Sequence, residues 1–316
     1  MRETEVAAGI LQFDDGRYLL AERPAGKILG GYLEFPGGKL EAGESPRAAL
    51  ARELEEELGI CVELAEPLVQ FSHDYPEHRV RAYLYRVAAW RGAPHGREGQ
   101  KLVWAAPGEL RELPLLPANQ PILAALELPR TLMVTPRLAG SDARDFLAFF
   151  ERAMRAGHPE GAILRLKAPP GRGGGPLLQE FAEAAERAGC PLVLNAGEAC
   201  ELPAGFAGLH LPARALAGLE SRPRIGGWVG ASVHDVGEAE QAGRLGLDYL
   251  VAGSLRKTAS HPRRMPLGWD GFDAIVRAAG MPVYAIGGMT TADLPEVHRH
   301  WGQGIAAIRA FWIPNE

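Results

Sequence analysis

Two patterns of hydrophobic and polar positions meet near residue 130 of the chain. Before that point, apolar runs of strand length surround one helix with a regular leucine stripe, whereas after it short apolar runs alternate with helical stretches. A chain of 316 residues is long for one hydrophobic core and comfortable for two. We therefore predict two domains, residues 1–129 and 130–316, joined at Pro129-Arg130.

The first pattern predicts an α+β sandwich. Apolar runs at residues 6–13 and 17–22 flank the turn Asp14-Asp15-Gly16, which is typical of a β-hairpin. Residues 80–89 and 102–105 have the composition of two further strands, and we expect residues 117–128 to form a closing helix.

The clearest helix is expected at residues 45–58. Ser45 is a good N-cap, Pro46 suits the first helical position, and Gly59 suits a C-cap. One face carries a leucine at every fourth position, which is the spacing of a helix face that packs on a core. These leucines are Leu50, Leu54 and Leu58.

Three glutamates of this helix point to metal chemistry. Glu53, Glu56 and Glu57 stand at i, i+3 and i+4, so the helix gathers them on one face. Neighbouring carboxylates repel one another unless a cation lies among them. With a carbonyl from Pro36-Gly37-Gly38, they offer the hard oxygen ligands that suit Mg²⁺ or Mn²⁺ in phosphate chemistry. The alternative is a charge-rich helix that only faces solvent.

The second pattern predicts a compact α/β barrel of the (β/α)8 TIM type, with an open parallel sheet as the alternative. Helical stretches such as 141–156, 176–188 and 270–279 separate eight apolar runs, and the glycine-rich residues 169–176 are expected to form an active-site loop. The expected strands are residues 132–135, 162–166, 192–194, 208–211, 228–231, 249–252, 283–286 and 305–308.

Polar residues stand at the carboxyl ends of these strands, where barrel enzymes build their active sites. The pair Gly287-Gly288, ahead of a helix start, suits a phosphate held on backbone N–H groups, or else a simple tight turn. The other candidates are Arg165, Lys167, Asn195, His210, Ser232, His234, Ser254 and Thr258.

Composition narrows the function classes. The chain is 47% hydrophobic and 23% charged, as is typical of a soluble protein, and its net charge of −5 gives no reason to expect a nucleic-acid partner. The scattered Cys61, Cys190 and Cys200 suit a reducing compartment. No signal peptide or apolar run of membrane-spanning length is visible. We expect a cytoplasmic protein without a membrane partner; the oligomeric state is left open.

Residues 38–60 resemble the Nudix box at every defined position. The pattern begins with a glycine, and a glutamate follows after five residues. Seven residues later come Arg52-Glu53 and an aliphatic residue, and after one more residue Glu56-Glu57. One further residue, a glycine and an aliphatic residue end the pattern. Residues 4–128 further resemble the MutT branch of that family, the 8-oxo-dGTP diphosphatases. The shared landmarks are Arg23, residues 33–38, residues 96–100 with Trp104, and Pro117-Ala118-Asn119.

This resemblance implies a Mg²⁺-dependent pyrophosphohydrolase that converts 8-oxo-dGTP to 8-oxo-dGMP and pyrophosphate. It implies Glu53, Glu56 and Glu57 as catalytic residues, with Glu53 as the base, and Gly37 and Glu98 as further metal ligands. It also implies that Asn119 reads the oxidised base, on which Phe35 packs. Alternatively, Asn119 caps a helix, Phe35 belongs to the core, and Arg23 and Glu98 are solvated charges. The implied nucleotide pocket comprises Arg23, Glu34, Phe35, Pro36, Gly38 and Asn119.

Residues 131–312 resemble the thiamine phosphate synthase/TenI superfamily, most clearly at 230–234, 248–249, 253–254 and 285–290. Asn195 is followed by alanine, and Pro212-Ala213-Arg214 replaces the acidic cluster with which the synthase binds Mg²⁺ and pyrophosphate. The sequence therefore favours a TenI-like thiazole tautomerase over a synthase. His234 would then carry the proton, since histidine exchanges protons near neutral pH; alternatively it only caps a helix or satisfies a strand end.

The resemblance implies a barrel ligand such as a thiazole or thiamine phosphate. The implied binding residues are Arg165, Lys167, Asn195, Ser232, Thr258, Gly287 and Gly288. Two further hypotheses stay open. The first domain hydrolyses a pyrophosphate of thiamine metabolism, or the second domain binds a phosphate ligand without catalysis.

Overall fold

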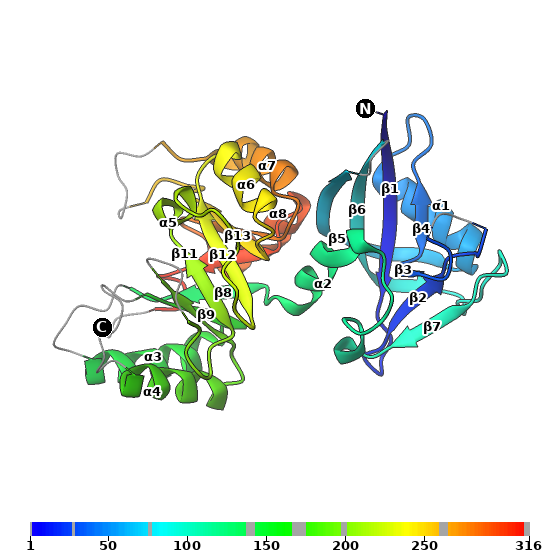
Figure 1. The fold of residues 1–316 in the computed structure, drawn as a ribbon. Coiled ribbons are helices and arrows are strands. Elements are labelled where there is room, and N and C mark those ends of the chain that lie inside the picture. Colours follow the sequence, from blue (N-terminus) through cyan, green and yellow to red (C-terminus); the bar gives the residue numbers. More distant parts are fainter. Residues whose placement is uncertain are drawn as a thin grey trace. The chain divides into compact units, whose positions relative to one another are not determined.

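The structure is a computed structural model that describes residues 2–26, 29–74, 78–136, 143–165, 175–196, 201–258 and 265–312. The chain divides into two compact units, residues 1–127 and 128–316, so the division falls two residues before the predicted junction (Figure 1). Within the described ranges, no helix is both long and apolar enough to cross a membrane.

The first unit is built on two β-sheets. The larger has the order β4-β1-β6-β5, and the smaller has the order β3-β2-β7. The strands of the larger sheet are β4 (Gly37–Lys39), β1 (Arg2–Leu11), β6 (His78–Arg91) and β5 (Cys61–Asp74). Those of the smaller sheet are β3 (Leu33–Glu34), β2 (Tyr18–Glu22) and β7 (Leu102–Ala105).

The predicted hairpin between the first two strands is wrong beyond its turn. The chain does reverse there, since the Gly16 N–H donates to the Phe13 carbonyl at 2.8 Å. Only one bridge, Gln12 to Tyr18, joins the two segments, and the strands then enter different sheets. The reason is that β1 uses both of its edges elsewhere: it pairs antiparallel with β4 and parallel with β6.

The helix α1 (Pro46–Leu58) forms as predicted. The Ser45 hydroxyl accepts from the Ala48 N–H at 3.3 Å, and Gly59 ends the helix in the left-handed conformation, φ 70°. The three stripe leucines are fully buried. The predicted closing helix is split into the short helix η2 (Pro117–Asn119) and α2 (Gln120–Glu127), and a further short helix, η1 (Pro107–Glu109), follows β7.

The second unit is a closed eight-stranded parallel barrel, which confirms the predicted barrel and excludes the open sheet. Its strands run β8 to β15 in chain order around the ring, and β15 pairs with β8 to close it. They are β8 (Thr131–Val134), β9 (Gly161–Arg165), β10 (Leu192–Asn195), β11 (Gly208–Leu211), β12 (Trp228–Val233), β13 (Tyr249–Gly253), β14 (Val283–Ile286) and β15 (Gly304–Ala307).

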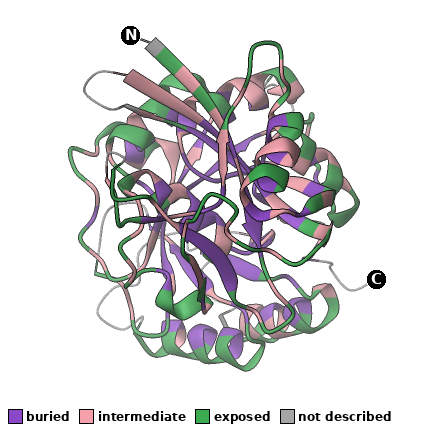
Figure 2. Ribbon diagram, turned by 90° about the vertical axis from the view of Figure 1, so that its right-hand side faces the viewer, coloured by how far each residue is buried: buried purple, intermediate pink, exposed green. Residues whose placement is uncertain are grey.

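Helices follow most of these strands along the chain. They are α3 (Ala143–Gly157), α4 (Gly175–Arg187), α5 (Ala213–Ala217), α6 (Val236–Arg244), α7 (Gly268–Ala279), η3 (Thr291–Asp293) and α8 (Leu294–Arg299). Figure 2 colours the chain by burial: many strand residues are purple, and green residues lie on the helices and loops. Most of the predicted glycine-rich loop, residues 169–174, lies outside the described residues.

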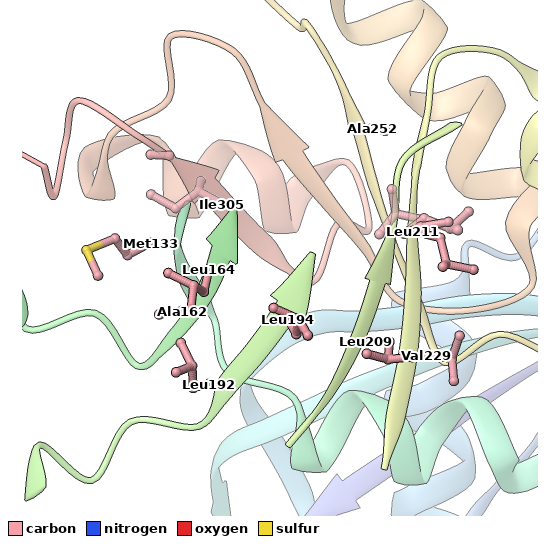
Figure 3. Packing of buried hydrophobic residues seen from close by; sticks show 14 of the residues in the cluster. Met133, Ala162, Leu164, Leu192, Leu194, Leu209, Leu211, Val229, Ala252 and Ile305 are labelled. Atoms are coloured by element: carbon pink, nitrogen blue, oxygen red, sulfur yellow. The ribbon is translucent and has the colours of Figure 1, made fainter. Parts of the chain in front are cut away.

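Alternation along the barrel strands separates two cores. Leu209 and Leu211 belong to a large apolar cluster that also contains buried helix residues such as Phe181 and Phe272. Figure 3 shows Leu209 and Leu211 together with cluster members from neighbouring strands. His210 lies between them in sequence, so its side chain points to the opposite face of the strand, into the barrel. Polar groups are thereby placed inside the ring.

Side chains in or next to β14 and β15 hold the segment that leads into the first barrel strand, residues 128–130, by hydrogen bonds. The Tyr284 hydroxyl donates to the Pro129 carbonyl at 2.5 Å, and Gln303 Nε2 donates to the Leu128 carbonyl at 3.0 Å. The Arg130 N–H donates to Glu160 Oε2 at 2.6 Å. Residues 128–130 therefore belong structurally to the second unit.

Candidate active site

The glutamates of α1 lie against the glycines of β4. The Gly37 N–H donates to Glu57 Oε2 at 3.0 Å. A methyl group on Gly38 would overlap the carboxylate of Glu53, so that position has room for glycine only while Glu53 points there. Two predicted metal ligands, Glu53 and Glu57, are therefore brought to the strand that supplies the predicted carbonyl ligand, Gly37.

Arg52 organises the carboxylates on the other side. Its guanidinium donates to Glu44 at 2.9 and 3.1 Å, to Glu53 at 2.9 Å and to Glu56 at 3.2 Å, and it also donates to the Lys39 carbonyl at 2.9 Å. The hydrogen bonds that Arg52 donates to Glu44 and then to Glu53 raise the pKa of Arg52, so its charge is permanent here. The hydrogen bond from Arg52 to Glu53 fixes where the Glu53 carboxylate lies.

Glu57 has the most perturbed carboxylate of this group. Burial is the main cause, and the charges of Glu98, Glu53 and Glu34 add to it, so that the pKa of Glu57 is raised to about 7 despite the hydrogen bond from Gly37. A cation among these oxygens would favour the ionised form and offset both effects. All of these side chains offer hard oxygen ligands, so the donor set fits Mg²⁺.

The hydrogen bonds of these carboxylates determine how they lie relative to one another. Among the described residues, no group of three or more His, Cys, Asp or Glu side chains has an arrangement that could hold a metal ion. The physical reason is that Arg52 holds Glu53 and Glu56, while Glu57 accepts from the Gly37 N–H. Of the predicted ligands, Glu53 and Glu57 lie beside β4, and Glu53 and Glu56 share the hydrogen bonds of Arg52.

A loop after β6 closes the carboxyl end of α1. Gln100 Nε2 donates to the Glu57 carbonyl at 3.0 Å, and Gln100 Oε1 accepts from the Glu98 N–H at 2.9 Å. Arg97 also donates to the Glu57 and Glu55 carbonyls. Gln100 thus fixes the backbone of Glu98 to that of Glu57. Sequence reasoning missed this role, although Gln100 stood within the segment 96–100.

The predicted nucleotide pocket includes a buried amide. Asn119 is only 7% exposed, and its Nδ2 has no hydrogen-bond partner among the described residues. A helix cap would use the side-chain oxygen and leave this nitrogen unsatisfied. Buried donors are normally paired, so the amide is suited to an acceptor on a ligand.

The other pocket residues lie on the neighbouring segment 33–36. Leu33 pairs with Leu115, which brings this segment beside the approach to Asn119. Arg23 forms an ion pair with Glu34. Phe35 is 4% exposed and packs in the core cluster of the unit, and the Pro36 carbonyl accepts from the Gly9 N–H at 2.8 Å. The contact of Phe35 with a base therefore stays a prediction.

Most candidates of the barrel gather at the carboxyl ends of the strands. Arg165 and Asn195 end neighbouring strands, and Arg165 Nε donates to the Thr135 carbonyl at 2.5 Å. The Thr258 hydroxyl is buried without a partner among the described residues. Gly287 and Gly288 adopt positive φ, 110° and 72°, as a tight glycine turn requires. Lys167 lies outside the described residues.

The two candidate histidines of the barrel, His210 and His234, lie in different environments. His234 lies between β12 and α6, where its N–H donates to Glu238 Oε2 at 2.6 Å and its Nδ1 lies 3.1 Å from the same oxygen. His210 was expected on the rim of the barrel, and that is wrong: it is 2% exposed. The reason is that it is the last residue but one of β11 and its side chain points into the barrel.

Comparison with known proteins agrees with both folds. Residues 7–125 match the model of the NUDIX domain, and residues 131–311, more than half of the chain, match that of thiamine monophosphate synthase. An 8-oxo-dGTP diphosphatase of Haemophilus influenzae is 42% identical over 39% of this chain and 90% of its own length. A CTP pyrophosphohydrolase of Escherichia coli is 40% identical over 40% of this chain and 92% of its own length.

The relative of the second unit is matched over a smaller share of its own length. A thiamine-phosphate synthase of Chloroflexus aurantiacus is 35% identical over 42% of this chain, which spans 62% of that protein. The match to the synthase model nevertheless covers almost the whole barrel. The chain therefore belongs to the Nudix family through its first unit, a hydrolase of the MutT type, and to the thiamine monophosphate synthase family through its second.

Proposed function

We propose that the first unit hydrolyses 8-oxo-dGTP to 8-oxo-dGMP and pyrophosphate with Mg²⁺, and so removes an oxidised nucleotide before it enters DNA. The observation that carries this proposal is the buried Nδ2 of Asn119, for which the described part of the chain provides no hydrogen-bond partner. An amide offers a donor and an acceptor together, which is what a reader of a purine edge needs. The similar proteins named 8-oxo-dGTP diphosphatase support the same substrate.

The residues of α1 and β4 would then carry out the hydrolysis. The Gly37 carbonyl and the carboxylates of Glu53, Glu56, Glu57 and Glu98 would hold the metal. When bound, Mg²⁺ offsets the charge of the phosphate oxygens and activates the attacking water. Glu53 is the base that accepts the proton of that water, and the hydrogen bond from Arg52 keeps its carboxylate in place.

Replacing Asn119 tests the substrate directly. We expect the wild-type chain to prefer 8-oxo-dGTP over dGTP in kcat/KM by about 100-fold or more, and Asn119→Ala to lose most of that preference. Its Tm should not fall, because the variant removes a buried donor that lacks a partner. The measurement is steady-state release of pyrophosphate from each nucleotide.

The neighbouring Gln120→Ala is the matched control, since Gln120 is exposed and should leave both rates unchanged. Equal turnover of 8-oxo-dGTP and dGTP by the wild type, or no turnover of either, would rule out the sanitising role. CTP belongs in the same assay because one relative at 40% identity is named a CTP pyrophosphohydrolase. Faster turnover of CTP would reassign the substrate while keeping the chemistry.

For the second unit, we propose binding of a thiazole phosphate or a thiamine-related phosphate, with His234 as the group that moves a proton. Glu238 engages Nδ1 of His234, so Nε2 is the nitrogen for that transfer. In deuterium oxide, the wild type should exchange a ring proton of a thiazole phosphate, whereas His234→Gln should bind it without exchange. Binding by the wild type with no exchange would instead make the barrel a non-catalytic ligand-binding module.

A further inference from the structure

Three side chains inside the barrel are arranged like a serine hydrolase triad. Ser232 Oγ lies 2.8 Å from His210 Nε2, and His210 Nδ1 lies 3.2 Å from the Tyr249 hydroxyl. A nucleophile, a base and a third group that orients the base have this order. The third member here is a phenol, whereas a triad uses a carboxylate, and this difference decides where the protons lie.

The contact between His210 and Tyr249 depends on a glycine. His210, Gly230 and Tyr249 pair in one row across β11, β12 and β13. A side chain on Gly230 would overlap the ring of Tyr249, so the glycine lets that ring pass over β12 to reach His210. Ser232 follows two residues later on the same face of β12, partly exposed at the carboxyl end of the barrel.

Proton positions follow from counting donors. Tyr249 is fully buried, and among the residues that the structure describes its hydroxyl has no hydrogen-bond partner except His210. If His210 Nδ1 carried the proton, the hydroxyl hydrogen of Tyr249 would be left buried and unpaired, which costs free energy. The favoured arrangement has Tyr249 donating to Nδ1, so that Nε2 carries the histidine proton and donates to Ser232 Oγ.

Both titratable groups hold the neutral forms that this arrangement needs. Burial and then the charge of Arg165 lower the pKa of His210 to about 3, so the ring does not become an imidazolium near neutral pH. Burial also raises the pKa of Tyr249 well above its ordinary value, so the phenol keeps its hydrogen.

We infer that His210 and Tyr249 are positioning residues for Ser232, which the family resemblance already implies as a binding residue: they direct its hydroxyl hydrogen toward the ligand of the barrel, so that Ser232 acts as a donor and not as a nucleophile. Because Ser232 Oγ already accepts from His210, its own hydrogen is available to another acceptor, and Ser232 is partly exposed at the carboxyl end of the barrel. The ligand must therefore present an acceptor there, either a phosphate oxygen or a ring nitrogen. This inference rests on the proposal that the barrel binds such a phosphate.

The protonation state can be measured without any ligand. In the full chain labelled with ¹⁵N-histidine, a long-range ¹⁵N–¹H spectrum distinguishes a proton on Nε2 from one on Nδ1, and comparison with His210→Gln assigns the signal. We expect Nε2–H for His210, unchanged from about pH 5 to about pH 8. A proton on Nδ1, or titration to the imidazolium within that range, would overturn the inference.

Two tyrosine variants then test the positioning role. Tyr249→Phe should remove the fixed tautomer of His210, whereas Tyr284→Phe should not, since the Tyr284 hydroxyl donates to the Pro129 carbonyl. An unchanged His210 signal in folded Tyr249→Phe would contradict the role of Tyr249. Labelling of Ser232 by a fluorophosphonate would show a nucleophile and would also overturn the inference.

Binding measurements identify the acceptor. Ser232→Ala should weaken binding of a thiazole phosphate about tenfold. If inorganic phosphate weakens equally, the acceptor is a phosphate oxygen; if only the thiazole phosphate weakens, it is the ring. No loss for either probe would refute the donor role. Failure of the wild type to bind either probe, with His210 protonated at Nε2, would instead refute the proposed ligand and leave the proton arrangement supported.

Discussion

Glu57→Gln is expected to lower kcat for nucleotide hydrolysis by about three orders of magnitude and to leave the fold intact. Glutamine keeps the shape of the side chain and an oxygen that can accept from the Gly37 N–H, but it removes the negative charge that a metal needs. Removing a charge from a half-buried acidic group also relieves repulsion, so Tm should not fall. The measurement is kcat with Mg²⁺, together with a thermal melt.

Glu55→Gln is the matched control on the same helix. Its side chain is exposed, and that variant should retain the wild-type rate. Glu53→Gln should resemble Glu57→Gln in kcat, because it removes both a proposed ligand and the proposed base. A nearly unchanged rate for either Glu53→Gln or Glu57→Gln would show that the metal assignment is wrong.

Gly38→Ala is the second substitution with a large expected effect, and it should separate activity from stability. The new methyl group would overlap the Glu53 carboxylate, which lies at the end of a flexible side chain and can move away at little cost. Moving a catalytic group by about 1 Å can cost about 100-fold in rate. We therefore expect kcat to fall by about 100-fold while Tm changes little.

Gly108→Ala provides the comparison for this variant. Gly108 also has an ordinary φ, but a methyl group there meets open space, so neither activity nor Tm should change. A large drop in Tm for Gly38→Ala would mean that backbone is displaced and that the loss of rate carries no information about Glu53. An unchanged kcat would show that Glu53 need not lie beside β4.

Local rules made much of the fold predictable. Caps and a leucine stripe fixed α1 because they act within one helix, and the repeated βα pattern led to a closed barrel because each strand is short and apolar. The partner of β1 was not predictable, since the turn at Gly16 determines only that the chain reverses. Which strand fills each edge depends on β4 and β6, which are distant in sequence.

For the site, too, features within one helix were predictable and contacts between distant segments were not. The spacing of Glu53, Glu56 and Glu57 placed them on one helix face, but their present positions depend on Arg52, whose hydrogen bond to the Lys39 carbonyl is tertiary. The inward position of His210 was missed because all four residues of β11 are buried, so no alternation of burial distinguishes its two faces. The proton arrangement with Tyr249 required the row of paired residues across three strands.

The hydrogen bonds that hold residues 128–130 determine where the barrel can be cut from the rest of the chain. The family match begins at residue 131, yet a fragment that starts there would remove the Pro129 and Leu128 carbonyls. The buried hydroxyl of Tyr284 and the amide of Gln303 would each lose an acceptor inside the barrel. An excised barrel should therefore begin at Leu128 or earlier.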